Sequence, residues 1–316
     1  MHAASPEPSA AAIHVYTHAS CLAHDTGPGH AERPERLSAV TDALRDAFGA
    51  RIQWHQAPAA SREQLLRTHA PSLLQLVLDA RQTQRVMLDP DTVLSTQSGE
   101  SALRAAGAGV AAVDAVLSGS ALRVFCAVRP PGHHATADTA MGFCHFNNVA
   151  VAAMHALDAH GLERVAIVDF DVHHGNGTQA IFERDPRVLY LSSHQMPLYP
   201  DTGRADEHGA GNIFNAPLYP GAGGEQFRSA WLAGLLPALE TFRPQLLLLS
   251  TGFDAHSRDP LAQLRLESED FAWLTRKLVA VADRHAHGRI VSMLEGGYDL
   301  EALRECSVAH VAALSG

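Results

Sequence analysis

The chain has 316 residues, of which 46% are hydrophobic, and a formal net charge of -10 at pH 7. This balance predicts a globular protein with a sizeable core and argues against general nucleic-acid binding, which needs a basic surface. The chain has no uninterrupted apolar run of about 18 residues to span a membrane and no basic secretion signal at its start. Its four cysteines lack CxxC spacing. We therefore expect a cytoplasmic protein with reduced thiols.

Short runs rich in valine, isoleucine and leucine alternate with stretches of helical periodicity. In chain order we expect a helix at 35–48, a helix at 98–118, a strand at 122–128, a helix at 147–160, strands at 164–170 and 187–193, a helix at 224–241, a strand at 244–250, a helix at 267–287, a strand at 289–294 and a helix at 299–314. Apolar strands separated by helices pair in parallel, with helices on both faces. The sequence therefore predicts a three-layer α/β fold with a mainly parallel sheet, in which 1–12 is a weakly held tail and 13–316 forms a single domain.

A polar segment follows each predicted strand directly. These segments read RPPGHHA, DVHHGNGT, HQMPLYPDTG, TGFDAHSRDP and EGGYDL in chain order. Parallel strands end at the same edge of a sheet, and ligands bind at that edge in open α/β sheets. We therefore expect the five loops to converge on one crevice.

The segment after the second strand carries candidate metal ligands. Asp169, Asp171 and His173 are spaced by two residues, so their side chains leave an extended chain on one face. Asp171 and His173, with Asp254 from the loop after the fourth strand, would give three ligands and an open position for water, as in catalytic zinc sites. The alternative is that Asp171 caps the next helix and His173 is an ordinary loop histidine, which explains this segment but not the similar clusters after the other strands.

The loop after the first strand carries two adjacent histidines. His133 and His134 follow two prolines and a glycine, and off the metal such a pair suits a general base and a general acid. Asp169 and Asn176 are their expected partners, and because a carboxylate favours imidazolium while an amide does not, the two pKa values are expected to diverge. Tyr298, which follows two glycines, offers a hydroxyl for a developing oxyanion. Loop histidines bonded to backbone and a packing tyrosine stay as alternatives.

The motifs RPPGHHA, MGFCHFNN, DFDVHHGNGTQ, GFDAH and EGGYDL, in this order and spacing, resemble those of the zinc-dependent histone deacetylase superfamily, in its class II-like bacterial deacetylase and acetylpolyamine amidohydrolase branch. The resemblance extends from Gly29 to the carboxyl end of the chain. It implies the arginase/deacetylase-like fold and a zinc-dependent amidohydrolase. Such an enzyme removes an acetyl or other acyl group from an N-acylated amine such as acetyl-lysine by means of metal-activated water.

The resemblance also assigns roles to individual residues. It implies one Zn²⁺ per chain held by Asp171, His173 and Asp254, and catalytic roles for His133, His134, Tyr298, Asp169 and Asn176. It implies a structural K⁺ near Asp169, Asp171, His173 and Ser192, held partly by backbone carbonyls. Gly142, Phe143, Tyr199 and Leu261 are implied as walls of a substrate tunnel, and Arg36 as facing an internal channel.

Some positions depart from the patterns of related families. Asn176 stands where histone-directed members carry aspartate, and Tyr199 where phenylalanine is frequent, which affects the width and polarity of the tunnel. Gly175 and His256 stand where the similar motifs of arginase have further aspartates for a second manganese ion. One metal ion is therefore expected, with iron(II) as the alternative to zinc because ligand type alone does not decide the metal.

The substrate and the assembly stay open at the level of sequence. Protein acetyl-lysine and small N-acyl amines such as acetylpolyamines are equally compatible; Leu261 provides no acidic gatekeeper, but Asp91 or Glu100 is available as one. A catalytically silent member that binds an acyl ligand is disfavoured because every catalytic position is intact. The acyl length, the choice between monomer and homo-oligomer, and which of His133 and His134 transfers the proton are not determined.

Overall fold

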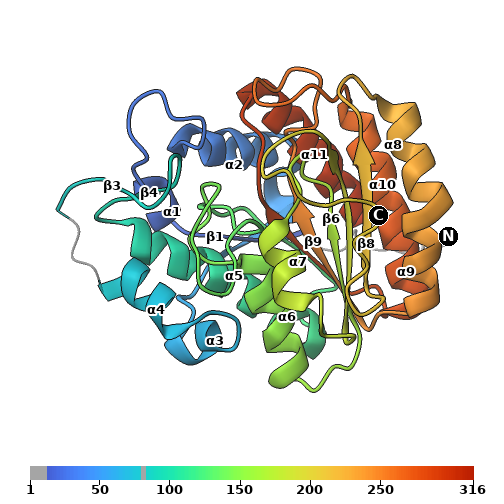
Figure 1. Cartoon of the computed structure of the whole chain (residues 1–316), viewed down its shortest axis with the longest axis horizontal. Helices are drawn as coiled ribbons and strands as arrows, with labels where there is room; N and C mark the ends of the chain where they lie inside the picture. Colours follow the sequence, from blue (N-terminus) through green and yellow to red (C-terminus); the bar gives the residue numbers. More distant parts are fainter. Residues whose placement is uncertain (1–12, 80–82) are drawn as a thin grey trace, which may run out of the picture.

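An eight-stranded sheet forms the centre of the computed structural model, which describes residues 13–79 and 83–316 (Figure 1). The order of the strands is β2(Ile52–Gln56), β1(Ile13–Thr17), β5(Arg123–Cys126), β10(Ile290–Leu294), β9(Leu246–Thr251), β6(Val165–Asp169), β7(Val188–Gln195) and β8(Ile213–Leu218). Every neighbouring pair in this sheet is parallel. The short strands β3(Val86–Met87) and β4(Val93–Leu94) pair separately and antiparallel.

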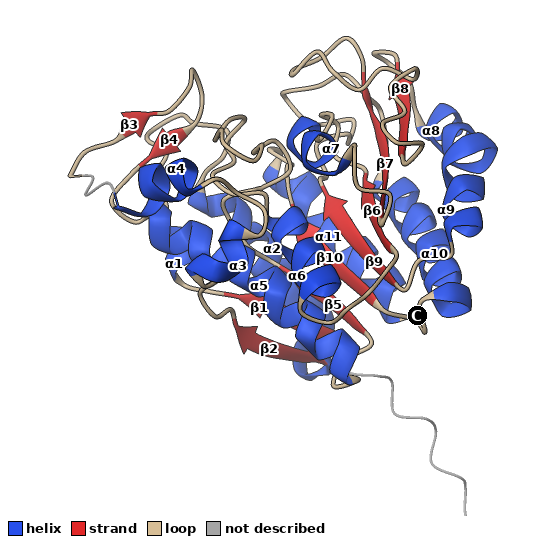
Figure 2. Ribbon diagram, turned by 60° about the horizontal axis from the view of Figure 1, so that its bottom comes forward, coloured by secondary structure: helices blue, strands red, loops and turns tan. Residues whose placement is uncertain are grey.

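Helices cover both faces of the sheet, as Figure 2 shows. On one side α2(Pro34–Phe48), α11(Leu300–Ser315) and α10(Ser268–His285) pack in sequence, followed by the continuous segment α8(Gly224–Ala230), η3(Trp231–Leu235) and α9(Leu236–Phe242). On the other side lie α5(Ser98–Ser118), α6(Asn148–Asp158) and α7(Asn176–Phe182). The short helices are α1(Ser20–Ala23), η1(Gly49–Arg51), α3(Arg62–Leu66), α4(Pro71–Leu74) and η2(Gln75–Asp79). The predicted three-layer α/β fold is confirmed.

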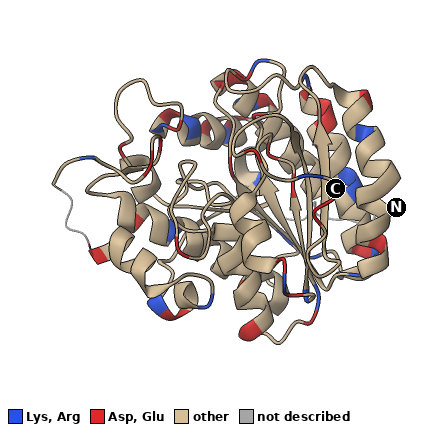
Figure 3. Cartoon of the chain, in the orientation of Figure 1, with Lys and Arg blue, Asp and Glu red and all other residues tan. Residues whose placement is uncertain are grey.

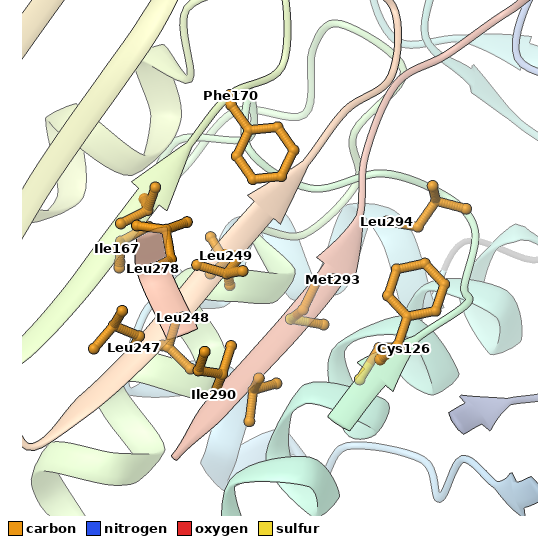
Figure 4. Packing of buried hydrophobic residues seen from close by; sticks show 14 of the residues in the cluster. Cys126, Ile167, Phe170, Leu247, Leu248, Leu249, Leu278, Ile290, Met293 and Leu294 are labelled. Carbon is orange, nitrogen blue, oxygen red and sulfur yellow. The ribbon is translucent and has the colours of Figure 1, made fainter. Parts of the chain in front are cut away.

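The central strands supply the middle of the core. Leu247, Leu248 and Leu249 of β9 are fully buried and lie beside Ile290 and Met293 of β10 (Figure 4). Full burial of one such side chain contributes about 1.5–3 kcal/mol. Because both faces of these strands are covered, their sequences are continuously apolar, which is why they could be recognised from the sequence.

Helix α5 packs unusually closely because its residues are small. A Cβ at Gly109 would lie 2.8 Å from Met293 Cε and 3.1 Å from Ala152 Cβ, so a larger residue there would require the Met293 side chain and α6 to shift. By length and a mean hydropathy of 1.2, α5 is apolar enough to cross a membrane even though Glu100, Arg104 and Asp114 interrupt it. Of this stretch, 61% is buried inside the fold, as in a core helix of a soluble protein.

All predicted strands and helices are present, with shifts of a few residues at their ends, and 224–241 is broken by the π-helical turn η3. Strands β1, β2 and β8 of the main sheet and the short strands β3 and β4 were not predicted. β1 and β2 mix buried residues with partly buried or exposed ones and so are not continuously apolar, and β8 contains Pro217, which argues against a strand except at a sheet edge. The predicted tail at 1–12 lies outside the described residues.

Candidate active site

The five predicted loops follow five strands that are contiguous in the sheet, in the order β5, β10, β9, β6, β7. All five strands run parallel, so the loops leave from the same edge. The candidate site residues from these loops, which are far apart in sequence, are thereby brought together. Acidic and basic residues are interspersed along the outer helices (Figure 3).

Asp171, His173 and Asp254 lie together at this edge. His173 Nδ1 is 3.1 Å from Asp171 Oδ1 and 3.3 Å from Asp254 Oδ2, and the three ligand atoms lie within 4.8 Å of one another. All three residues are buried. The sequence-based expectation that they share one site therefore agrees with the geometry.

Backbone amides orient the two carboxylates. Asp171 Oδ2 accepts a hydrogen bond from Gly296 N at 2.8 Å, and Asp254 Oδ1 accepts one from Val172 N at 2.8 Å. Each carboxylate is thus held by one oxygen and presents the other toward His173. A Cβ at Gly296 would collide with Asp254 Oδ2 and Asp171 Oδ2, so a glycine is required beside these carboxylates.

The donor set fits a divalent cation. Asp254 Oδ2 is buried and accepts no hydrogen bond from the described residues, because His173 Nδ1, 3.3 Å away, bonds to Asp171 Oδ1 instead; this is costly unless a cation binds there. Burial and the neighbouring Asp171 raise the pKa of Asp254, because two buried carboxylates repel each other. A cation between them would remove both penalties, and two carboxylate oxygens with one imidazole nitrogen are common ligands for zinc.

His133 and His134 have the predicted partners. His133 Nδ1 donates to Asp169 Oδ2 at 3.0 Å, and His134 Nδ1 donates to Asn176 Oδ1 at 2.8 Å. The two imidazole centroids are 4.1 Å apart. The alternative that these histidines only bond to backbone is therefore wrong.

The environments of the two histidines drive their pKa values in opposite directions. Burial by itself would lower the pKa of His133, but Asp169 and Asp171 outweigh it and raise the pKa well above its usual value. Burial, together with the nearby His133 and His173, lowers the pKa of His134 well below its usual value. The arrangement favours a charged His133 beside a neutral His134 that can accept a proton.

A cavity of about 260 Å³ leads to these groups. It is lined by Asp91, His134, Gly142, Phe143, His173, Leu198, Tyr199, Leu261 and Tyr298. All four predicted wall residues are in this set. Asp91 also lines the cavity. Glu100 is not among the lining residues, and its carboxylate accepts a hydrogen bond from Arg104 at 2.7 Å. Of the two candidates for an acidic gatekeeper, only Asp91 therefore lies at the cavity.

Tyr298 is buried at the inner part of the site. Its amide donates to Asp259 Oδ2 at 2.7 Å, its ring packs edge-on against Phe143, and the Arg36 guanidinium lies 4.8 Å from its ring centroid. Burial raises the pKa of the Tyr298 hydroxyl well above its usual value, so it is a hydrogen-bond donor at neutral pH. Arg36 itself donates to the carbonyls of Glu295 and Gly297 and so supports the turn that carries Tyr298.

The residues named for a structural K⁺ lie along β6 and β7 and in the following loop. Asp169 and Ser192 are register partners in the two strands. Both oxygens of Asp169 already accept hydrogen bonds, from Asp171 N on one side and from His133 and Tyr190 on the other. A monovalent cation here would therefore depend mainly on backbone carbonyls and on Ser192.

The sequence did not reveal a buried ionic network behind the site. The Glu32 carboxylate accepts hydrogen bonds from Arg129 Nε at 2.5 Å and Nη2 at 2.7 Å and from Arg36 Nη1 at 3.1 Å, and all three side chains are fully buried. Glu295 accepts hydrogen bonds from Gly132 N and His133 N at 2.6 and 3.2 Å, and burial raises the pKa of Glu295 to about 7. Arg129 and Glu295 occur in the motifs RPPGHHA and EGGYDL and Glu32 lies three residues after Gly29, where the resemblance begins, but nothing in their spacing indicates that they are partners.

Comparison with known proteins gives one consistent result. The family profile of the histone deacetylase domain matches residues 30–314. The chain is 42% identical over 321 residues to a histone deacetylase-like amidohydrolase of Pseudomonas aeruginosa, covering 94% of this chain and 84% of that protein. It is 41% identical to the human polyamine deacetylase HDAC10, covering 90% of this chain and 45% of that protein. The crystal structure of the HDA15 HD domain superposes with a TM-score of 0.92 at 34% identity, covering 98% of this chain and 89% of that one.

Proposed function

The chain belongs to the histone deacetylase family, and we propose that residues 13–316 form a single cytoplasmic catalytic domain that hydrolyses the amide of an N-acylated amine with one bound Zn²⁺. The observation that carries this proposal is the buried set of Asp171, His173 and Asp254 with an unpartnered Asp254 oxygen, next to a neutral histidine and a tyrosine hydroxyl. A bound zinc ion would polarise the substrate carbonyl and lower the pKa of water toward roughly 7. The structural K⁺ is proposed with it, on the resemblance alone.

The proton transfers are assigned to His134. Its Nδ1 is held by Asn176, which leaves Nε2 free to accept a proton from the attacking water and to return it to the departing amine. His133, charged and held by Asp169, acts mainly through its electrostatic field. The Tyr298 hydroxyl donates a hydrogen bond to the carbonyl oxygen as negative charge develops there.

Two substrate classes remain candidates. An acetyl-lysine side chain fits a narrow cavity with aromatic and apolar walls, such as Phe143, Tyr199 and Leu261. A small cationic acylamine is favoured by the Asp91 carboxylate in the same wall, and the similarity to a polyamine deacetylase points in the same direction. A substitution at Leu261 can distinguish the two substrate classes. A carboxylate at this position would attract a second positive charge on a polyamine.

The test is a panel of acetyl-lysine peptides, acetylpolyamines and longer acyl-lysines, compared by kcat/KM with and without a chelator. We expect acetate release that chelation abolishes and Zn²⁺ restores, and loss of activity in Asp254→Asn. Leu261→Glu is expected to raise kcat/KM for acetylpolyamines relative to peptides. A chain that binds one zinc ion yet releases no acid from any substrate would support the catalytically silent alternative and overturn the proposal.

A further inference from the structure

A second group of histidine and aspartate side chains, which are residue types that ligate metals, lies outside the active site, on α5 and at the end of α6. His155 Nε2 is 2.8 Å from Asp114 Oδ1, and His160 Nε2 is 2.7 Å from the same oxygen. The imidazole centroids are 5.1 Å apart, and the three ligand atoms lie within 4.8 Å of one another. Of the described residues, only this group and the active-site set have this geometry.

The local fold holds the two histidines together. The chain leaves α6 through a left-handed residue, Gly161 with φ of 69°, and Leu162 N donates back to Ala156 O at 3.2 Å. This turn is a common way for a helix to end, and it brings His160 back beside His155. The side chain of Asp114 is 53% exposed and that of His160 32%, so an ion has access from solvent, while His155 is 9% exposed and held within the helix packing.

We infer that Asp114, His155 and His160 form a second metal site, for a divalent transition-metal ion of the zinc and nickel class. Two imidazole nitrogens and one carboxylate oxygen suit these ions, and the remaining positions would be filled by water. In a tetrahedral zinc site with bonds of about 2.0–2.1 Å, neighbouring ligand atoms are about 3.3 Å apart. The present contacts need to open by only about half an ångström, which rotation of exposed side chains provides.

Charge and hydrogen bonding bear on how tightly the ion is held. The Asp114 carboxylate oxygen Oδ1 accepts hydrogen bonds from both imidazoles, from His155 Nε2 at 2.8 Å and from His160 Nε2 at 2.7 Å. The ion must displace the imidazole protons that now point at Asp114, so acidification is expected to weaken binding.

Arg67, which lies beside His155, is expected to weaken binding of the ion. Its Nη1 lies 3.3 Å from His155 Nδ1, and its Nη2 donates to Glu63 at 2.9 Å. A His155 that binds metal through Nε2 carries its proton on Nδ1 and then needs an acceptor, which a guanidinium is not. Replacing Arg67 by glutamine supplies an acceptor and removes a positive charge, so Arg67→Gln is expected to tighten binding.

The site joins α5 and α6, and the start of α6 contacts the loop that carries His133 and His134. At the other end of α6, the Asn147 side chain accepts from Ala150 N at 3.0 Å and donates to Ala135 O at 3.1 Å, next to the histidine pair. An ion bound by α5 and α6 together should therefore raise thermal stability. This inference does not depend on the proposed function.

The full-length protein, freed of metal and dialysed against Zn²⁺ at pH 7.5, should bind two ions per chain. The double variant Asp114→Asn/His160→Ala should bind one and keep its catalytic activity, and Asp254→Asn should also keep one. His208→Ala, which removes another exposed histidine, is the control and should bind two. The Zn²⁺-dependent rise in melting temperature of Asp254→Asn should disappear when the double substitution is added.

Two results would overturn the inference. One is equal zinc content in the wild type and in Asp114→Asn/His160→Ala. The other is an Asp254→Asn protein that binds no zinc although Asp114, His155 and His160 are intact. If the wild type binds a single ion that the double substitution removes, the surface site stands and it is the proposed catalytic site that fails.

Discussion

Asp169 and Asn176 differ by one chemical group, and that difference separates the two active-site histidines. Asp169 is ionisable and holds His133, whereas Asn176 offers an uncharged amide oxygen to His134. The pKa of His134 is lowered, so this imidazole stays neutral and able to accept a proton as the pH falls below neutrality. At the scale of the residue, the identity of each partner sets which histidine transfers protons.

Asn176→Asp should therefore change the pH dependence of catalysis. A carboxylate beside Nδ1 stabilises imidazolium and raises the pKa of His134, so the base is blocked up to a higher pH. We expect the acidic limb of the kcat/KM profile to move to higher pH while the zinc content is unchanged. An acidic limb at the same pH in both proteins would show that His134 does not accept the proton.

Tyr298→Phe tests the hydroxyl without changing the packing of the ring on Phe143 and Arg36. Loss of one oxyanion donor should lower kcat by about 10²–10³. Zinc content and melting temperature should stay close to those of the wild type. Full turnover in this variant would remove Tyr298 from the mechanism.

At the scale of the element, the strands determine where the loops begin, and the glycines determine how closely the loops approach one another. Asp171 and Asp254 follow the neighbouring strands β6 and β9, and Gly296 follows β10. The sequence showed only that two glycines precede Tyr298. It did not show that Gly296 lies against two carboxylates, because that contact joins segments far apart in the chain.

Gly296→Ala should accordingly weaken metal binding. The added methyl group would meet Asp254 Oδ2 and Asp171 Oδ2, and displacement of ligands or of groups that orient them costs about 10- to 100-fold in metal affinity. Gly234→Ala is the matched control, since a Cβ there meets no atom within 4 Å. Zinc titration by calorimetry should separate the two variants, and equal affinities would contradict the role given to Gly296.

At the scale of the whole molecule, a set of buried histidines makes stability depend on pH. Burial is the largest cause of a pKa lowered to about 3 in His24, His174 and His310 and to about 4 in His69, His145 and His194. The unfolded chain binds protons at these positions below pH 6.5 while the folded chain does not. Each therefore contributes stability that is fully present above pH 6.5 and is lost as the pH falls toward 3 or 4.

His310→Gln isolates one member of this set. His310 links α10 to β10, with Nδ1 2.7 Å from Thr275 Oγ1 and Nε2 2.8 Å from Ser292 Oγ, and glutamine can keep a hydrogen bond there without titrating. Between pH 7.5 and pH 5.0 the wild type should lose about 2 kcal/mol more unfolding free energy than the variant. Urea titrations with chelator present at both pH values provide the measurement, and equal losses would contradict the prediction.

The sequence alone was sufficient for the central part of this protein. Strands β5, β6, β7, β9 and β10 are buried on both faces and therefore continuously apolar, and the residues of the expected metal set follow them within a few positions. Parallel pairing then requires their loops to meet at one edge. Periodicity and local spacing carry this information, because each depends only on residues near one another in the chain.

Only the tertiary structure decided the rest. Strands β1, β2 and β8 mix polar and apolar residues. β2 and β8 are the edge strands of the sheet and β1 lies between β2 and β5, so their pairing depends on neighbours and not on their own pattern. Glu32 meets Arg129 across 97 positions, and Asp114 meets His155 across 41. Contacts of this kind produce no repeating pattern in the sequence. They join residues that come close together only when the chain has folded.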